Sequence, residues 1–239
     1  MRALRFLVAC AALLWMSLPA VCQGRGFVRA AELVPNSSGF GDQSWELLAA
    51  EREFRLDGRG KLRSNTGRTA VLPLSENCFI SGQVYSSSHH GDLLLFFEES
   101  DAESAGGVLL RVETRTLQVL WKHSFSAFNI GRPLIAGDAV YLTGYASAAK
   151  VALSNGRSLW QSVELGKSSG DEFAAFGLPE LSHREVILKA LERKGQSAGS
   201  RGWVKEPGVV WLDRATGQVL RMQPTRYSAT KLPRGWLGN

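Results

Sequence analysis

The chain has 239 residues, 44% apolar and 21% charged, a composition that supports one compact core but not several large domains. Its formal net charge of +6 is spread without long runs of one sign, which excludes an extended nucleic-acid footprint. Three cysteines, two of them in the first 22 residues, exclude a disulfide-rich scaffold.

Residues 1–22 predict a signal peptide. Arg2 and Arg5 precede the apolar run Phe6–Leu18, which is shorter than the roughly 20 residues that a transmembrane helix needs. We therefore expect a protein that is periplasmic or secreted, with no transmembrane segment once the signal is removed. Removal also lowers the formal net charge from +6 to +4, because both lost charges are basic.

Two features of the cleavage zone stay open. Cleavage after Cys22 and cleavage after Gly24 both leave small residues at the junction. Lipidation of Cys22 would tether the mature protein to a membrane. It is the less favoured alternative, because Val21 and Pro19 depart from the bacterial lipoprotein signal.

Three segments are expected after the signal. They are an exposed N-terminal segment over residues 23–44, a repeat domain over 45–226 and a C-terminal tail over 227–239. Near the start of the domain, Trp45–Arg63 fits either a β-hairpin or a short helix, and the sequence does not separate the two.

Three apolar runs begin with a Gly-Asp or Arg-Glu pair and predict strands: Gly91–Phe97, Gly137–Leu142 and Arg184–Leu188. They are continuously apolar instead of alternating between apolar and polar residues. We therefore expect both faces of each strand to be buried between neighbouring sheets.

An internal repeat organises the chain. Arg111–Trp121 and Trp211–Arg221 align without gaps, and Val151–Trp160 is a shorter third copy whose final Trp lies 39 residues after that of the first. Each copy has an apolar strand, a polar turn and a second strand, which is the pattern of a β-hairpin. Glu113 and Asp213 supply an acidic residue at the turn in two copies. A unit of about 40 residues is typical of stacked or radial sheet arrays.

The three copies resemble the pyrroloquinoline-quinone-like (PQQ-like) β-propeller repeat, whose pattern reads Ala-Leu-Asp-x-x-Thr-Gly-x-x-Leu-Trp. The resemblance implies an all-β chain folded as a small or incomplete β-propeller of about four to five PQQ-like or WD40-like blades. It also implies that Trp121 and Trp160 dock between adjacent blades near a turn glycine, and Gly156 and Gly217 are the glycines of this kind.

Two copies depart from the family pattern. Leu117 stands where the turn glycine is expected, and Arg221 stands where the final Trp is expected. These departures predict degenerate or terminal blades.

No catalytic residue, cofactor or metal site is predicted. The quinone-dependent enzymes of the resembled family use a calcium-bound cofactor and, in many members, a disulfide between adjacent cysteines, whereas this chain has no adjacent cysteine pair. His89, His90 and Asp92 are awkward ligands for one ion, because adjacent residues on a strand point to opposite faces. We interpret them as a polar turn that leads into a strand.

Exposed loops are the candidate recognition elements, since loops on a rigid scaffold commonly carry binding residues. We expect such loops at Ser86–His90, Glu98–Gly106 and Ser168–Phe176. The second holds an acidic cluster of the kind that steers a basic partner. The candidate partner-binding residues are His89, His90, Glu98, Glu99, Asp101, Asp171 and Glu172.

These observations favour a non-catalytic extracytoplasmic binding or scaffold protein that presents loops to a protein partner in the envelope. Two alternatives stay open. One is a degenerate quinoprotein-like oxidoreductase or hydrolase that acts on envelope sugars or alcohols, and the other is a ligand-binding sensor without turnover. Some proteins that this repeat resembles act as scaffolds in outer-membrane protein assembly, which is an analogy of fold and not evidence of role.

Overall fold

The computed structural model describes residues 25–33, 43–49, 51–101, 103–165, 175–191, 203–206, 208–223 and 226–229. Within these residues all regular elements are β-strands, paired antiparallel, which confirms the predicted all-β class. The same residues include no helix able to cross a membrane. The predicted signal peptide at 1–22, Cys22, Asp171 and Glu172 lie outside the described residues.

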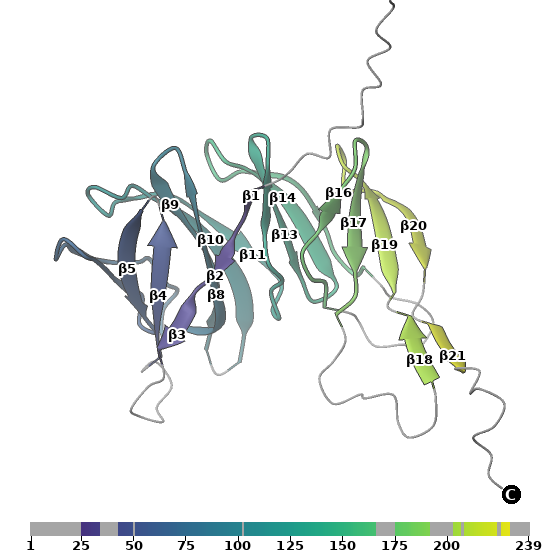
Figure 1. The fold of residues 1–239 in the computed structure, drawn as a ribbon, viewed down its shortest axis with the longest axis horizontal. Coiled ribbons are helices and arrows are strands. Elements are labelled where there is room, and N and C mark those ends of the chain that lie inside the picture. The colour runs from purple at the N-terminus through teal and green to yellow at the C-terminus, as the bar shows by residue number, and fades with distance from the viewer. Residues whose placement is uncertain are drawn as a thin grey trace, which may run out of the picture.

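Four sheets follow one another in chain order, and the first and fourth lie at opposite ends of a row (Figure 1). The first sheet consists of β3 (Ala31–Leu33), β4 (Ser44–Ala49), β5 (Arg52–Asp57), β6 (Lys61–Ser64) and β7 (Thr69–Val71). The second consists of β2 (Val28–Arg29), β8 (Phe79–His89), β9 (Asp92–Ser100), β10 (Ala105–Val112) and β11 (Val119–Phe125). The third consists of β1 (Arg25–Gly26), β12 (Leu134–Ala136), β13 (Ala139–Gly144), β14 (Ser147–Ala152) and β15 (Ser158–Ser162).

The fourth sheet consists of β16 (Glu180–Leu181), β17 (Glu185–Lys189), β19 (Val209–Asp213) and β20 (Val219–Gln223). A separate ribbon pairs β18 (Trp203–Glu206) with β21 (Arg226–Ala229). The segment Trp45–Arg63, for which a hairpin and a helix were both open, therefore forms strands β4 to β6. Strand β21 begins at Arg226, so the predicted tail over 227–239 starts inside a strand.

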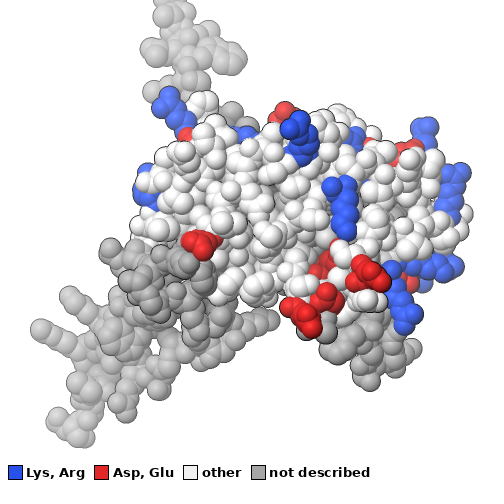
Figure 2. All heavy atoms as spheres, turned by 180° about the vertical axis from the view of Figure 1, so that it is seen from behind, with Lys and Arg blue, Asp and Glu red and all other residues white. Residues whose placement is uncertain are grey.

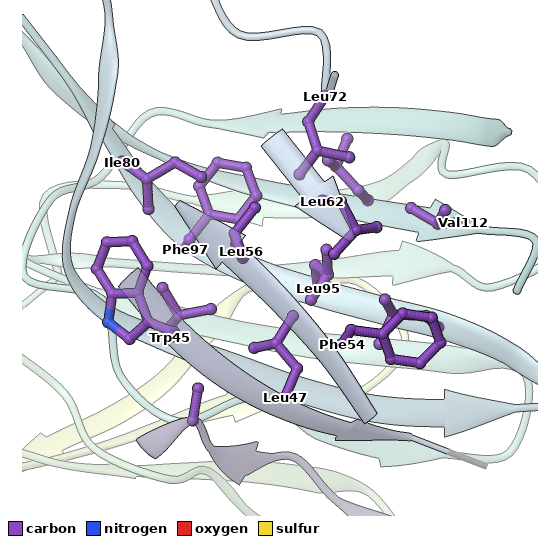
Figure 3. Packing of buried hydrophobic residues seen from close by; sticks show 14 of the residues in the cluster. Trp45, Leu47, Phe54, Leu56, Leu62, Leu72, Ile80, Leu95, Phe97 and Val112 are labelled. Carbon is purple, nitrogen blue, oxygen red and sulfur yellow. The ribbon is translucent and has the colours of Figure 1, made fainter. Parts of the chain in front are cut away.

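Each pair of neighbouring sheets encloses one apolar cluster, because successive side chains of a strand point to opposite faces. On β9, Phe97 packs into the cluster between the first and second sheets, shown in Figure 3, while Phe96 packs between the second and third. On β13, Val140 joins the second cluster and Tyr141 joins the third. Burying one such large apolar side chain contributes about 1.5–3 kcal/mol, so these clusters hold the sheets face to face.

The three apolar runs differ in how deeply they are buried. Strand β13 is buried along its whole length and most of β9 is buried, as their continuous apolar sequences predict. On β17, in contrast, Val186 and Leu188 are buried while Ile187 is half-buried. The expectation of two buried faces is therefore wrong for β17, because the described residues place a neighbouring sheet on only one side of the fourth sheet.

Residues 25–33, within the predicted exposed N-terminal segment, form short strands, and their side chains are partly exposed and partly buried. These residues form β1, β2 and β3, which pair with β12 of the third sheet, β8 of the second and β4 of the first, in that reverse order. The side chain of Phe27 is fully buried, and its carbonyl accepts a hydrogen bond from the guanidinium of Arg132. Short strands of two or three residues carry too little pattern to be read from the sequence.

Two predicted loops are strands over part of their length. Ser86 to His89 continue β8, and Ser86 is buried, so the turn proper is confined to His90 and Gly91. Glu98 and Glu99 belong to β9, and the chain reverses only between Ser100 and Ala105. These residues are predicted as loops because their side chains are polar, but their backbones pair with neighbouring strands.

Candidate functional site

The repeat residues form the contacts between neighbouring sheets. We call each such contact, in which a residue of one sheet packs on a turn of the next, a joint. The indole Nε1 of Trp121, on β11, donates a hydrogen bond to the carbonyl of Leu153 in the third sheet at 3.1 Å. The ring lies against Gly156, which has a φ of 70°, and a Cβ added there would lie 2.7 Å from Cε3 of the indole. Only glycine combines this backbone conformation with so close an approach.

The same joint recurs between the third and fourth sheets. Trp160 donates from Nε1 to the carbonyl of Arg214 at 3.2 Å, and its ring lies 2.7 Å from where a Cβ of Gly217 would be. A basic side chain accompanies the indole at each joint: Arg111 donates to the Leu153 carbonyl at 3.0 Å and Lys150 to the Arg214 carbonyl at 3.4 Å. These residues therefore connect sheets, and their geometry gives them a structural role.

The acidic residues of the repeat close their own turns. The carboxylate of Asp213 accepts hydrogen bonds from the backbone N–H of Thr216 at 2.8 Å and of Ala215 at 3.0 Å. Hydrogen bonds from the Thr216 backbone and hydroxyl hold the pKa of Asp213 below its usual range. Glu113 accepts from the N–H of Thr116 at 3.2 Å in the equivalent turn. Both carboxylates are thereby committed to the turn backbone.

The joint between the first and second sheets is built differently. Leu117 occupies the position of Gly156 and Gly217, keeps a left-handed φ of 62°, and is 2% exposed within the first apolar cluster. No Trp of β7 presses on this turn, so a leucine side chain fills the space beneath it. The departure from the family pattern at Leu117 is therefore compensated by packing.

Glu99 belongs to the same joint and is not an exposed recognition residue. Its side chain is buried, forms an ion pair with Lys122 at 3.3 Å and accepts a hydrogen bond from the backbone N–H of Ser75. Burial raises the pKa of Glu99, but the hydrogen bonds from Ser75 and the charge of Lys122 together lower it by more than burial raises it. The net result is a pKa below the usual range. Lys122 also donates to the carbonyl of Pro73 at 2.7 Å.

The remaining predicted partner-binding residues are separated. His89 and His90 lie at one end of β9, whereas Glu98 and Asp101 lie at the other, so the structure does not bring them into one site. The rings of the two histidines are 4.1 Å apart, contrary to the expectation of opposite faces, because His90 leaves the strand with a φ of 51°. In the residues that the structure describes, no three His, Cys, Asp or Glu side chains are grouped to hold a metal.

A set of apolar side chains that the sequence did not single out lies at the lower end of the sheets in Figure 1, where the turns after β9, β11 and β13 lie. Phe128 stacks on Tyr145 with ring centroids 4.6 Å apart, and the Tyr145 N–H donates to the Phe128 carbonyl at 2.8 Å. Phe128 is 41% exposed. The pair therefore presents a fixed aromatic surface to solvent.

Two leucines continue this surface. Tyr145 forms a β-bridge with Ala175, whose carbonyl accepts a hydrogen bond from the N–H of Leu191 at 2.7 Å. Leu191 in turn packs close to Gly177, the neighbour of Leu178, and both leucines are exposed. We call these four residues the aromatic patch: Phe128, Tyr145, Leu178 and Leu191.

One acidic group, Glu98, lies beside the aromatic patch, and a second, Asp101, lies next to Cys78. Glu98 accepts a hydrogen bond at 2.8 Å from the backbone N–H of Asn129, the residue after Phe128, and burial raises the pKa of Glu98 above its usual range. Asp101 lies on the β9–β10 turn, where backbone N–H groups of Glu103 and Ser104 lower its pKa. Seen from behind, acidic side chains gather at this lower edge of the molecule (Figure 2).

A concave surface lies along the first sheet and reaches Val28 and Arg29 of β2 and Ser86 of β8 in the second sheet. It is a groove of about 880 Å³. Its lining includes the exposed side chains that alternate with the buried ones of β4 to β6, and the turn that follows β6; these are Glu46, Leu48, Glu53, Arg55, Arg63, Asn65 and Gly67. The groove is therefore charged at its walls and faces solvent.

Comparison with known proteins gave no matching family model. No curated protein matches the sequence. Among solved structures, the chain is similar to the crystal structure of BamB from Moraxella catarrhalis, with 16% sequence identity and a TM-score of 0.47. The match covers 83% of this chain and 52% of that one, so the chain spans about half the length of that structure. What this chain does is therefore inferred from its own residues.

Proposed function

We propose that the protein is a non-catalytic binding or scaffold protein, built from PQQ-like propeller blades, that engages a protein partner outside the cytoplasm through the aromatic patch. The observation that carries this proposal is a stacked, solvent-facing Phe128–Tyr145 pair fixed by backbone hydrogen bonds. Rigid aromatic side chains supply much contact area at little entropic cost, which is why they are enriched at protein interfaces.

The surroundings of the patch support recognition of a protein. Leu178 and Leu191 are 44% and 53% exposed beside the aromatic pair, and contiguous exposed apolar side chains with a polar rim mark interaction sites. Glu98 at the edge of the patch suits a partner with basic residues around an apolar anchor, because opposite charges speed association.

The proposal is tested by photo-crosslinking in cells. A benzophenone amino acid at Phe128 is expected to form a discrete adduct with a protein partner, and the same probe at Leu120 is the matched control. Leu120 is similarly exposed, at 47%, but lies on the outer strand β11. Adducts at neither position, or the same adducts at both, contradict the proposal.

A substitution pair then tests the contact itself. Phe128→Asp is expected to weaken binding to the captured partner at least about tenfold, since truncating a central aromatic anchor typically costs 2 kcal/mol or more. Leu120→Asp leaves binding unchanged. Equal loss from both changes, or no loss from Phe128→Asp, would show that the aromatic patch is not the interface.

The extracytoplasmic location is part of the proposal and rests on the signal-like sequence of residues 1–22. Mass spectrometry of the exported protein is expected to find a mature N-terminus after Cys22 or Gly24. Recovery of the intact N-terminus from a cytoplasmic fraction contradicts it.

A further inference from the structure

The fourth sheet repeats the joint of the other sheets with its two key residues exchanged. Arg111 pairs across the strands with Trp121, and Lys150 pairs with Trp160. In the fourth sheet the corresponding pair is Trp211 with Arg221. Each of these three sheets thus has a basic residue and an indole side by side. In the second and third sheets, this pair lies on the face that contacts the next sheet.

The exchanged pair is ordered. The guanidinium of Arg221 lies 4.5 Å from the centre of the Trp211 ring, and it forms an ion pair with Glu185 at 3.1 Å. Ile187 and Val209 flank the pair on the same face and are half-buried. We call this surface, made of Glu185, Ile187, Val209, Trp211 and Arg221, the tail face. The described part of the chain places no further four- or five-stranded sheet over it.

The first sheet presents the other half of such a joint. The turn between β6 and β7 is closed by a hydrogen bond from Ser64 N–H to the Arg68 carbonyl, like the bond from Glu113 to Gln118 in the second sheet. This turn contains Gly67 with a φ of 86°, and an added Cβ there would meet no atom within 4 Å. At Gly156 and Gly217 the same space holds an indole.

The open glycine lies in the groove described above, along the first sheet. The turn is one residue shorter than those of Gly156 and Gly217, and the Asn65 carbonyl follows its first hydrogen-bonded residue just as the Leu153 and Arg214 carbonyls, which accept indole N–H groups, follow theirs. We call this groove with its turn the head face. Glu46, Glu53, Arg55 and Arg63 line it, and Glu46 forms an ion pair with Arg55 at 3.3 Å. Glu53 is therefore the carboxylate that complements the guanidinium of the tail face.

We propose that the tail face of one copy of the chain docks on the head face of a second copy. Both halves of one joint occur on this chain, at opposite ends of the row of sheets (Figure 1). A second copy is therefore the occupant that matches each face without requiring any new kind of contact. This inference concerns surfaces distinct from the aromatic patch and does not depend on it.

Two copies joined in this way close on themselves. Head-to-tail contacts form a ring when the rotation between copies closes, and a twofold ring contains two identical joints and leaves no face uncovered. With four sheets from each copy, such a ring has eight sheets. The assembly is thus a closed dimer, and a growing filament is the outcome for a rotation that does not close.

The test is the molar mass of the exported, mature protein in solution, measured by light scattering over the micromolar range. A mass twice that of one chain is expected. A single-chain mass throughout that range overturns the docking of tail face on head face, and a ladder of growing species overturns the closed dimer.

Paired variants distinguish head-to-tail docking from a symmetric contact. Arg221→Glu alters the tail face and Glu53→Arg alters the head face. Each variant alone is expected to be monomeric, because like charges then meet at both contacts, while a mixture regains dimers through the one intact head and one intact tail. Arg115→Glu, the same change at an exposed turn residue of the second sheet, is the matched control and stays dimeric. Failure of the mixture to form dimers, or dimers from either variant alone, overturns the head-to-tail arrangement.

Discussion

The contact between Trp121 and Gly156 allows a quantitative test of the sheet joint. In Gly156→Ala the new Cβ would lie 2.7 and 2.8 Å from two indole carbons, so the ring or the turn must move. Overpacking of this kind costs about 1–3 kcal/mol, and holding alanine at a left-handed φ costs about 1–2 kcal/mol. We expect a loss of about 2–5 kcal/mol in the free energy of unfolding, measured by urea denaturation.

Gly137→Ala is the matched control, because Gly137 also has a positive φ but open space around it and lies outside the proposed head and tail faces. It is expected to lose only the conformational part, about 1–2 kcal/mol. In a Trp121→Ala background, Gly156→Ala should likewise cost only this part, since the indole that it meets has been removed. Equal losses at the two glycines in the natural chain would refute the reasoning, because they would show that the indole exerts no pressure on the turn.

Three further changes probe individual residues by the same unfolding measurement. Leu117→Ala empties a fully packed position and is expected to cost about 2–5 kcal/mol, whereas a cost below that of Gly137→Ala would show that the side chain is not needed there. Glu99→Gln lowers stability at neutral pH, because the folded chain holds the pKa of Glu99 below its ordinary 4.5. The difference in stability from the natural chain should vanish as the pH falls through the folded pKa. A difference that stays constant with pH argues against the ion pair with Lys122. Burial lowers the pKa of His123 below its ordinary 6.5, although the Gly156 carbonyl partly opposes this, so stability is lost as the pH falls below about 6.5. His123→Gln is expected to make stability depend less on pH in this range. An unchanged pH dependence would exclude His123 as its source.

The hairpins of the repeat could be predicted because their signals are local. An apolar strand, a polar turn and a second strand lie within about ten residues, and the copies Arg111–Trp121 and Trp211–Arg221 keep this order. The structure forms them as β10–β11 and β19–β20. The register shift that lets each turn close is visible only in the structure.

Features that depend on distant partners could not be predicted. Glu99 looks like part of a solvated acidic cluster, and only the fold brings Lys122 and Ser75 to it. The aromatic patch is assembled from Phe128 and Tyr145 on different connections, so neither residue stands out in the sequence. Ser86 reads as a loop residue because serine carries no apolar signal, yet its backbone pairs with two strands.

The three short strands β1, β2 and β3 bear on the order in which the molecule is completed. Arg25 finds its partner at Ile135, whereas Ala31 finds its partner at Glu46, so the earliest of these residues to leave the ribosome waits longest for a neighbour. Contacts of such long sequence separation form late, after local hairpins have closed. Phe27 therefore remains uncovered until the third sheet has formed, and during that interval a chaperone that binds exposed aromatic segments has access to the chain.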